Sequence, residues 1–306
     1  VVPVEDTDDG ARGTSSLPSA VSIKKPFQRG AFVRYQGDDV KRGEKILEAG
    51  TLIHPADIAL MAAVGHARVQ VYRQPRVAVL ATGDELVEPN QKPDRGQIRN
   101  SNEYAVAALI AQSGGLPVRL GIARDNKESI AAKLDQAIGQ GVDLIIATAG
   151  VSVGAYDFVK DVIASNGSID LWRVRMRPGK PLAFGNYRSV PFFGLPGNPV
   201  SAMLTFEQFV RPVLRVMAGF AHWRKPTIDV VLLESIESDG RETYARAWLQ
   251  RDADRWTAKL SGGQESNMLK SLARANALVI VPDGVTHLER GSIAQAQLLI
   301  AFDDIQ

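Results

Sequence analysis

The sequence predicts an α/β protein with a central, mostly parallel β-sheet that carries helices on both faces. Continuous apolar runs such as Val77–Ala81 and Val142–Ala147 are typical of strands that are buried on both faces. These runs alternate with helical patterns, which implies right-handed crossovers between parallel strands. After residue 222 only short strand patterns separated by turns remain, which indicates a small C-terminal β-barrel.

The length of the chain indicates more than one domain. Its 306 residues exceed the roughly 150 residues of an ordinary domain. We expect a remnant of N-terminal β-rich and linking domains over residues 1–74, the α/β domain over 75–222 and the β-barrel over 223–306. The chain opens with Val1–Val4 and no initiator Met, so we interpret it as a fragment.

Each element has a local signal. In the N-terminal part we expect short strands at 21–23, 31–33 and 68–72, and a helix over Pro55–Val64 that Gly65 closes. In the α/β domain a helix near Asn102 precedes a strand, and Asp125 with Glu128 forms a capping-box pattern for the next helix. Further elements are a helix around residues 159–163, strands at 116–122, 169–174 and 190–193, a long helix over 199–217, and barrel strands at 228–232, 244–249, 256–260, 277–281 and 293–298.

Composition excludes several classes of function. Lys and Arg number 36 against 34 for Asp and Glu, so there is no general field to attract nucleic acid or an anionic membrane. The absence of cysteine excludes disulfides, thiolate metal sites and a cysteine nucleophile. No apolar run approaches the roughly 20 residues that span a bilayer. We therefore expect a cytoplasmic protein without nucleic-acid or membrane partners.

Three clusters of residues that could form a functional site follow the ends of predicted parallel strands. Ligands of open parallel sheets bind outside the carboxyl ends of the strands. Thr82–Glu85, Thr148–Gly154 and Leu195–Pro199 each follow a predicted strand. Their shared position at one sheet edge is a stronger signal than any one of them alone.

The glycine-rich turn is ambiguous by itself. Gly150 and Gly154 let backbone N–H groups approach a phosphate, and the following helix would add its positive end. The turn is neither the dinucleotide fingerprint nor a Walker loop. Taken alone, it is better explained as a tight connection between a strand and a helix.

Four carboxylates, Asp84, Glu85, Asp125 and Asp157, lie at or near strand ends. Grouped hard oxygen ligands suit Mg²⁺, which keeps several waters and bridges to phosphate. Structural roles compete: Asp125 can cap a helix, Asp157 falls in a first helical turn, and Asp84 can satisfy its own loop. Glu85 has no comparable structural role immediately after a buried strand.

Two further features concern anions. The loop Arg175–Pro181 is basic and contains two prolines, so it can hold an oxyanion or remain a solvated loop. Asn198–Pro199 is primarily a helix-start pattern. The four histidines lack ligand spacing, which gives little support to zinc or to a Ser-His-Asp triad.

At these residues the sequence resembles the MoeA-type molybdopterin molybdenumtransferases, relatives of the gephyrin E domain. The resemblance covers most of the chain in the order of the family. Its motifs are Gly37–Val40, Thr82–Leu86, Gly96–Asn102, Arg124–Asp125, Gly150–Gly154 with Asp157, Arg177–Pro181 and Gly194–Ser201.

The resemblance implies an activity and a site. Molybdate would react with adenylylated molybdopterin in the presence of Mg²⁺, and AMP would leave. The catalytic carboxylates would be Asp39, Glu85, Asp125 and Asp157, and the last three would also bind the metal. Pterin or phosphate contacts would come from Thr82, Gly83, Asp84, Gly150, Val151, Ser152, Gly154, Lys180, Pro196, Gly197, Asn198, Pro199 and Ser201. The resemblance also implies a homodimer and contact with the molybdopterin adenylyltransferase.

Two departures from the family pattern bear on these expectations. Members of the family carry a further N-terminal stretch that reaches the partner subunit's site, which leaves open whether this chain turns over alone. Ala149 stands where the family usually has glycine. Two alternatives also stay open: an adenylyltransferase of the same fold, which the C-terminal barrel disfavours, and a gephyrin-like scaffold, which the acidic cluster disfavours.

Overall fold

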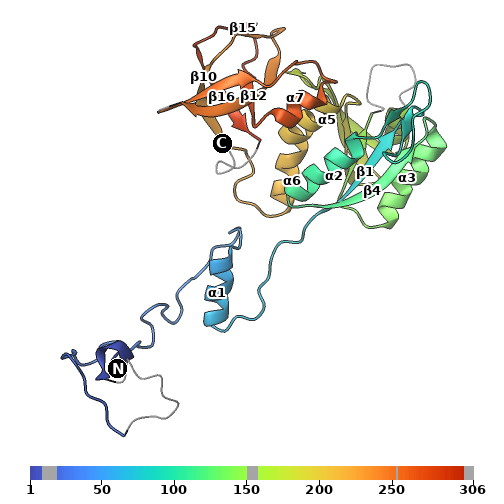
Figure 1. Ribbon diagram of the computed structural model, residues 1–306. Coiled ribbons are helices and arrows are strands. Elements are labelled where there is room, and N and C mark those ends of the chain that lie inside the picture. Colours follow the sequence, from blue (N-terminus) through green and yellow to red (C-terminus); the bar gives the residue numbers. More distant parts are fainter. Residues whose placement is uncertain (9–18, 150–157, 253, 300–306) are drawn as a thin grey trace. The chain divides into compact units, whose positions relative to one another are not determined.

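The computed structural model describes residues 1–8, 19–149, 158–252 and 254–299. It divides into two compact units, residues 1–70 and 71–306 (Figure 1). The α/β sheet and the C-terminal barrel both belong to the second unit. The three-domain division predicted from the sequence stays a prediction.

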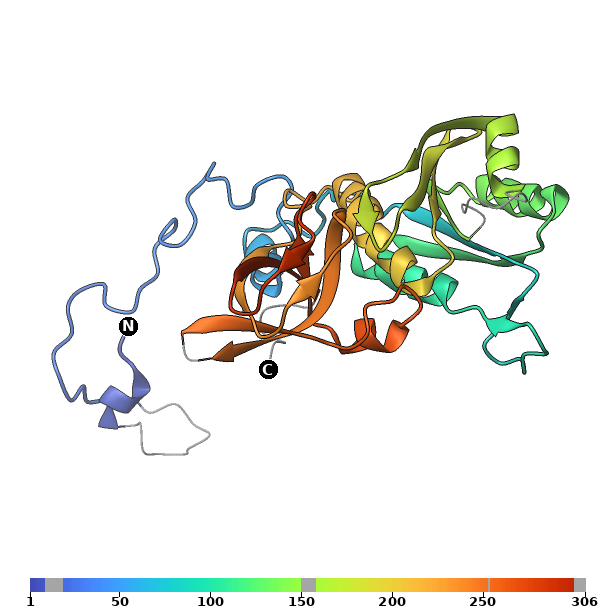
Figure 2. The same ribbon diagram turned by 90° about the horizontal axis from the view of Figure 1, so that it is seen from above.

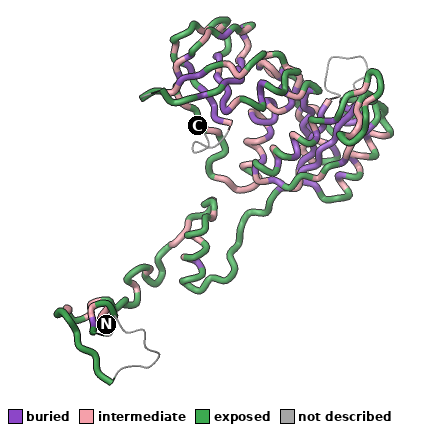
Figure 3. The backbone as a smooth tube through the Cα atoms, in the orientation of Figure 1, coloured by how far each residue is buried: buried purple, intermediate pink, exposed green. Residues whose placement is uncertain are grey.

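The N-terminal unit contains little regular structure. It holds the short 3₁₀ helix η1 (Val4–Asp6) and the helix α1 (Pro55–Ala63), which confirms the predicted helix. The Asp57 carboxylate accepts a hydrogen bond from the backbone N–H of His54 at 2.8 Å and so closes a capping box. Most of this unit is exposed, with Thr7 and Met61 among its buried residues (Figure 3).

Three predicted strands are wrong. Ile23 makes one isolated bridge to Thr7, and residues 31–33 and 68–72 form no strand. Within residues 1–8 and 19–70, no neighbouring strand pairs with their β-favouring residues to complete a ladder. A strand without paired neighbours is not stable in water.

The sheet of the α/β domain has six strands in the order β4-β1-β5-β9-β8-β6. Strands β4, β1, β5 and β9 are mutually parallel, and β8 runs antiparallel to both of its neighbours. The mostly parallel sheet is therefore confirmed. The strand bounds are β1 Arg76–Thr82, β4 Leu116–Ala123, β5 Leu144–Thr148, β6 Gly167–Arg173, β8 Pro181–Tyr187 and β9 Val190–Leu195.

Strand β8 is missing from the sequence prediction. Its residues begin with Pro181 and include Gly185 and Asn186, which are depleted in strands. The antiparallel pairing with β9 over Ala183–Tyr187 decides its conformation instead.

Helices cover both faces of the sheet (Figure 2). On one face α3 (Lys127–Gly139) and α4 (Phe158–Asn166) pack against Ala78 and Leu80 of β1. On the other, α2 (Asn102–Gln112) and the helical run after β9 pack against Val77 and Val79. Successive residues of β1 thus enter opposite cores, which explains why the run is continuously apolar.

The predicted long helix is one helical run with an irregular centre. It consists of α5 (Pro199–Thr205), the π-helical segment η3 (Phe206–Val210) and α6 (Arg211–Met217). Pro212 lacks an N–H group, and its ring would meet a carbonyl one turn earlier in a regular helix. The π segment immediately before it widens the turn. No helix of the described residues is long and apolar enough to cross a membrane.

The C-terminal domain is a closed five-stranded barrel, and all five predicted strands are confirmed. Closure follows because β13 pairs with both β10 and β12. The barrel strands are β10 Thr227–Leu232, β12 Glu242–Asp252, β13 Arg255–Leu260, β14 Ala277–Val281 and β16 Ile293–Leu298. The smaller elements are β11 Ile236–Glu237, β15 His287–Leu288 and α7 Leu269–Arg274.

The barrel is joined to the α/β domain by strand pairing and packing. The short strand β7 (Met176–Arg177) adds to the edge of β12, so the basic loop runs along the barrel. Met176 and Leu204 pack with Tyr244 and Leu278 in a shared apolar cluster. This junction places the barrel beside the helical run that follows β9.

Candidate functional site

The carboxyl ends of four parallel strands meet at one edge of the sheet. Thr82 at the end of β1 lies in register with Ala123 of β4, and its neighbour Ala81 with Thr148 of β5. Thr148 in turn lies beside Leu195 of β9. The loops that follow these strands therefore share one rim, as the sequence pattern predicts.

Asp84 and Asp125 form an acid pair on this rim. The backbone N–H of Asp125 donates to Asp84 Oδ1 at 3.3 Å, and Arg124 Nη1 donates to the carbonyl oxygen of Asp84 at 3.3 Å. The pKa of Asp125 is raised, chiefly by partial burial and also by the negative charge of Asp84. A hydrogen bond from the Asp84 backbone opposes the rise.

Asp125 does not cap the following helix, so that prediction is wrong. The N-cap of α3 is Asn126, whose Oδ1 accepts from the N–H of Ser129 at 2.8 Å. The cap lies one residue later because Asn126 has the extended backbone that an N-cap requires. The Asp125 carboxylate is thus left for another role, which weakens the structural explanation of this residue.

Glu85 lies over the backbone of the first loop. A Cβ added to Gly83 would meet the Glu85 carboxylate oxygens at 2.5 and 2.6 Å. Gly83 also has φ +149°, a conformation that other residues rarely adopt. Gly83 therefore permits both the sharp exit from β1 and the position of Glu85.

The acid pair leads to a prediction for Asp84→Asn. Removing the neighbouring charge should lower the pKa of Asp125, while the part of the rise that burial causes remains. Because the folded pKa lies above the unfolded value, ionised Asp125 opposes folding at higher pH, and the substitution reduces that opposition. Carboxyl NMR titration measures the shift of the Asp125 pKa. The control Asp229→Asn, at an exposed position of β10, should leave the Asp125 pKa unchanged. An unaltered or raised Asp125 pKa in Asp84→Asn would refute the coupling.

The buried ends of β1 and β5 carry hydroxyl groups. Thr82 is 1% exposed, and its Oγ1 has no hydrogen-bond partner among the described residues. Thr148 is similarly buried at the end of β5. An unpaired buried hydroxyl is costly, and one at a ligand-binding edge is a candidate contact for a bound group.

The turn after β9 is held by the start of α2. Asn102 Nδ2 donates to the carbonyl oxygen of Gly197 at 2.7 Å. Asn198 occupies the predicted N-cap position of α5, but its side chain makes no capping bond. Pro196 and Ser201 are buried, and Pro199 opens the helix.

Ala149, the departure from the family pattern, has φ +72°. Left-handed backbone costs an L-residue roughly 1–2 kcal/mol. Ala149→Gly should therefore stabilise the protein by about 0.5–1 kcal/mol, after allowing for the greater freedom of the unfolded chain. Denaturant unfolding measures the change. Ala147→Gly, in the regular part of β5, should destabilise, and destabilisation by both would refute the strain.

The remaining predicted residues are placed only in part. Gly150, Val151, Ser152, Gly154 and Asp157 lie outside the described residues. Asp39 is exposed in the N-terminal unit, and Lys180 is exposed after β7. Among the described residues, no three His, Asp or Glu side chains group to hold a metal ion. Glu85 and Asp125 are the described members of the predicted metal set, which stays a prediction.

Arg246, a buried arginine on β12, carries no signal in the sequence pattern. It is 0% exposed. Its Nε donates to Ser271 Oγ at 2.9 Å and its Nη2 to the carbonyl oxygens of Gly263 and Glu265, at 2.8 and 3.2 Å. Nη1 has no partner among the described residues. Burial lowers the pKa of Arg246 to about 10, Glu265 opposes this, and the charge of Arg177 adds to it.

Arg246 lies behind a loop that touches the sheet edge. Ser266, in the loop whose carbonyl groups hold Arg246, accepts a hydrogen bond from the N–H of Val200 at 3.2 Å. Val200 belongs to the first turn of α5, directly after the Pro196–Pro199 turn. A cation with an unsatisfied donor is thus connected to the rim that carries the carboxylates.

Glu103 is a second residue that sequence analysis missed. Its fully buried carboxylate accepts from Asn100 Nδ2 at 2.8 Å and from the N–H of Gly121 at 2.9 Å, and it pairs with Arg119 at 3.3 Å. Gly121 lies at a β-bulge, where the register between β1 and β4 shifts. Such bulges redirect the end of a strand, and the end of this strand carries Arg124 and Asp125.

Glu103→Gln should destabilise the protein by about 1–3 kcal/mol. The amide oxygen keeps an acceptor for Gly121, but the new NH₂ group faces the donor Asn100 Nδ2, and the negative charge that pairs with Arg119 is lost. Denaturant unfolding measures the loss. The matched variant is Glu48→Gln, which removes an exposed pair with Lys45 and should change stability by less than about 0.5 kcal/mol. Equal effects of the two substitutions would exclude a special role for the buried carboxylate.

Comparison with known proteins agrees with this architecture. The probable molybdopterin binding domain matches residues 78–216, the MoeA N-terminal region (domain I and II) residues 1–65, and the MoeA C-terminal region (domain IV) residues 229–299. A solved structure of a MoeA protein from Pyrococcus horikoshii is 28% identical with a TM-score of 0.77, over 97% of this chain and 71% of that one. The α/β domain therefore matches the probable molybdopterin binding domain, and the barrel matches the MoeA C-terminal region.

Curated relatives identify the family. The molybdopterin molybdenumtransferase of Nostoc is 40% identical over 269 residues, which are 86% of this chain and 62% of that protein. The molybdopterin molybdenumtransferase of Haemophilus influenzae is 33% identical over 293 residues, 95% of this chain and 69% of that one. The chain belongs to the molybdopterin molybdenumtransferase family, and it spans about two thirds of the length of these relatives.

Proposed function

We propose that this chain inserts molybdate into adenylylated molybdopterin, with Mg²⁺ assisting and AMP leaving. The observation that carries the proposal is that the loops after β1 and β4, which carry Asp84, Glu85 and Asp125, meet at the carboxyl edge of the parallel strands. Ligands of such sheets bind at this edge. The names of the relatives supply the substrate class.

The described carboxylates suit Mg²⁺. Both Glu85 and Asp125 offer hard oxygen ligands, and a divalent cation would offset the negative charge that Asp84 places beside Asp125. Glu85 and Asp125 would hold the ion together with Asp157. When bound, Mg²⁺ supplies charge neutralisation for the phosphate oxygens.

The basic side of the site would hold the oxyanions. Arg246 has an unpartnered Nη1 in a buried position, where a charge-assisted hydrogen bond to an anion is strong. Lys180, exposed on the loop after β7, would add a mobile positive charge. We assign molybdate to Arg246 and the substrate phosphates to Lys180.

The protein's own contribution is positioning and electrostatics. Cleavage of a phosphoanhydride mainly requires that the reacting groups are aligned and that their charge is neutralised. Thr82, Gly197 and Ser201 would align the substrate at the rim. The carboxylates would hold Mg²⁺ beside the substrate phosphates. The predicted homodimer and the contact with a molybdopterin adenylyltransferase complete this proposal and stay predictions.

The test is release of AMP from adenylylated molybdopterin by this chain, with and without molybdate, with the Nostoc relative as reference. Molybdate-dependent release by both supports the proposal. Release by the relative beside a well-folded, silent chain would overturn it for this chain. Formation of adenylylated molybdopterin from ATP instead would identify the adenylyltransferase alternative.

A further inference from the structure

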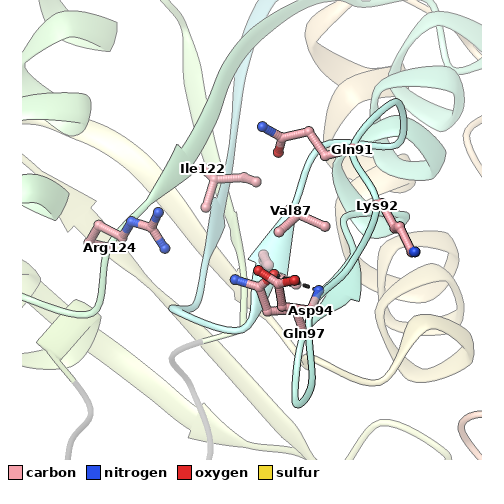
Figure 4. Close-up of a pocket in the computed structure, with 8 residues that line it drawn as sticks. Val87, Gln91, Lys92, Asp94, Gln97, Ile122 and Arg124 are labelled. Carbon is pink, nitrogen blue, oxygen red and sulfur yellow. Dashed lines mark hydrogen bonds between the residues drawn. The ribbon is translucent and has the colours of Figure 1, made fainter.

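A hollow lies beside the acid pair, between the end of β4 and the loop that joins β2 (Leu86–Val87) to β3 (Ile98–Arg99). Its volume is about 350 Å³. Pockets that bind small molecules are typically about 300–1,000 Å³. Figure 4 shows Arg124 on one side, the loop on the other and Ile122 between them. The lining residues are Leu86, Val87, Gln91, Lys92, Asp94, Gln97, Ile122 and Arg124.

The hollow combines apolar residues with two glutamines whose amide oxygens accept hydrogen bonds from the backbone of the loop. Leu86, Val87 and Ile122 supply the apolar lining. Gln91 Oε1 accepts from the N–H of Glu88 at 3.0 Å, and Gln97 Oε1 accepts from the N–H of Asp94 at 3.0 Å. Each of these hydrogen bonds fixes the orientation of the amide, and the NH₂ group of each glutamine is then available as a donor.

Charged groups complete the hollow. Arg124 holds the carbonyl oxygen of Asp84 with one nitrogen, which leaves further guanidinium donors for a second partner. Asp94 supplies an acceptor beside Gln97. The Lys92 amine is directed away from Ile122 and Val87 (Figure 4), so Arg124 is the cation that serves this space.

We propose that this hollow binds a flat nitrogen heterocycle that carries a phosphate. The ring lies on the apolar lining, its acceptor nitrogens face the NH₂ groups of Gln91 and Gln97, and its exocyclic amine faces Asp94. The phosphate points to Arg124 and so toward the acid pair. This rests on the proposed function, because adenylylated molybdopterin contains two groups of this kind, AMP and a pterin phosphate.

The test replaces single atoms in the lining. Gln91→Glu and Gln97→Glu keep an oxygen for the loop hydrogen bonds but remove the NH₂ donors. Asn90→Asp is the matched control, since it makes the same change of charge at an exposed position of the same loop outside the lining. Calorimetric titration gives the Kd of AMP and, separately, of a pterin monophosphate without a nucleoside.

We expect the Kd of one of the two ligands to rise about tenfold in each glutamine variant and by less than twofold in Asn90→Asp. Loss confined to AMP assigns the hollow to adenine, and loss confined to the pterin phosphate assigns it to the pterin. Unchanged binding of both ligands in both glutamine variants overturns the proposal, as does an equal loss in Asn90→Asp. Molybdate-dependent AMP release by the unsubstituted chain is measured separately. If the chain releases AMP but both glutamine variants bind the two ligands normally, only the proposal for the hollow is rejected. If the glutamine variants lose binding but the unsubstituted chain releases no AMP, only the proposed function is rejected.

Discussion

Glu85→Gln is expected to reduce molybdate-dependent AMP release at least a hundredfold, about 2.7 kcal/mol or more of transition-state stabilisation. The amide has the same shape and can keep the position over Gly83. It loses the negative charge that a metal ion requires of this ligand. Stability should change by less than about 0.5 kcal/mol, because the side chain is exposed.

Two readouts make this expectation specific. AMP release measures turnover, and Mg²⁺-dependent AMP binding measures the metal site without turnover. Glu289→Gln, an exposed change on the barrel, should alter neither. A Glu85→Gln protein that keeps both would remove Glu85 from the catalytic set.

Arg246→Met is expected to raise the molybdate concentration needed for half-maximal AMP release at least tenfold. The substitution removes the charge and the unpartnered Nη1 while filling similar space. Replacement of a buried charge by an apolar side chain is often tolerated, so the protein should fold with a stability change of about 1–3 kcal/mol or less. Ser271 Oγ keeps its hydrogen bond to Met268.

A conservative variant and a control separate binding from folding. Arg246→Lys keeps a positive charge but loses the fork that reaches Ser271, Gly263 and Glu265 together, so it should restore molybdate binding only in part. Arg251→Met changes an exposed arginine on the same strand and should leave the molybdate dependence unaltered. A molybdate dependence that is normal in Arg246→Met would make this arginine purely structural.

Features that short stretches of sequence encode can be predicted without the tertiary structure. The run Val77–Ala81 enters two apolar cores, so its composition alone indicates a strand buried on both faces. The end of β4 and the start of α3 show the limit of such patterns. Asp125 and Asn126 are both good caps, and only the backbone conformation assigns the cap to Asn126.

Charged residues expose the other limit. Side chains alternate along β12, so Ala245 and Ala247 point into the barrel core and Arg246 points outward. On a barrel without further elements packed against it, this outer face would be exposed to solvent. It is buried because the 261–268 loop and Ser271 cover it. Glu103 resembles a favourable first-turn acid of α2, but Gly121 and Arg119, which hold it, come from another strand.

The sequence by itself determined the alternating α/β order, the five barrel strands and the rim whose loops carry Asp84, Glu85 and Asp125, because periodicity and parallel topology are encoded in short windows. Only the tertiary structure decided the antiparallel β8, the failure of the strands at 21–23, 31–33 and 68–72, the burial of Arg246 and Glu103, and the hollow beside Arg124. Each of these depends on a partner distant in the chain, and the free energy of pairing or desolvation outweighs local preference there.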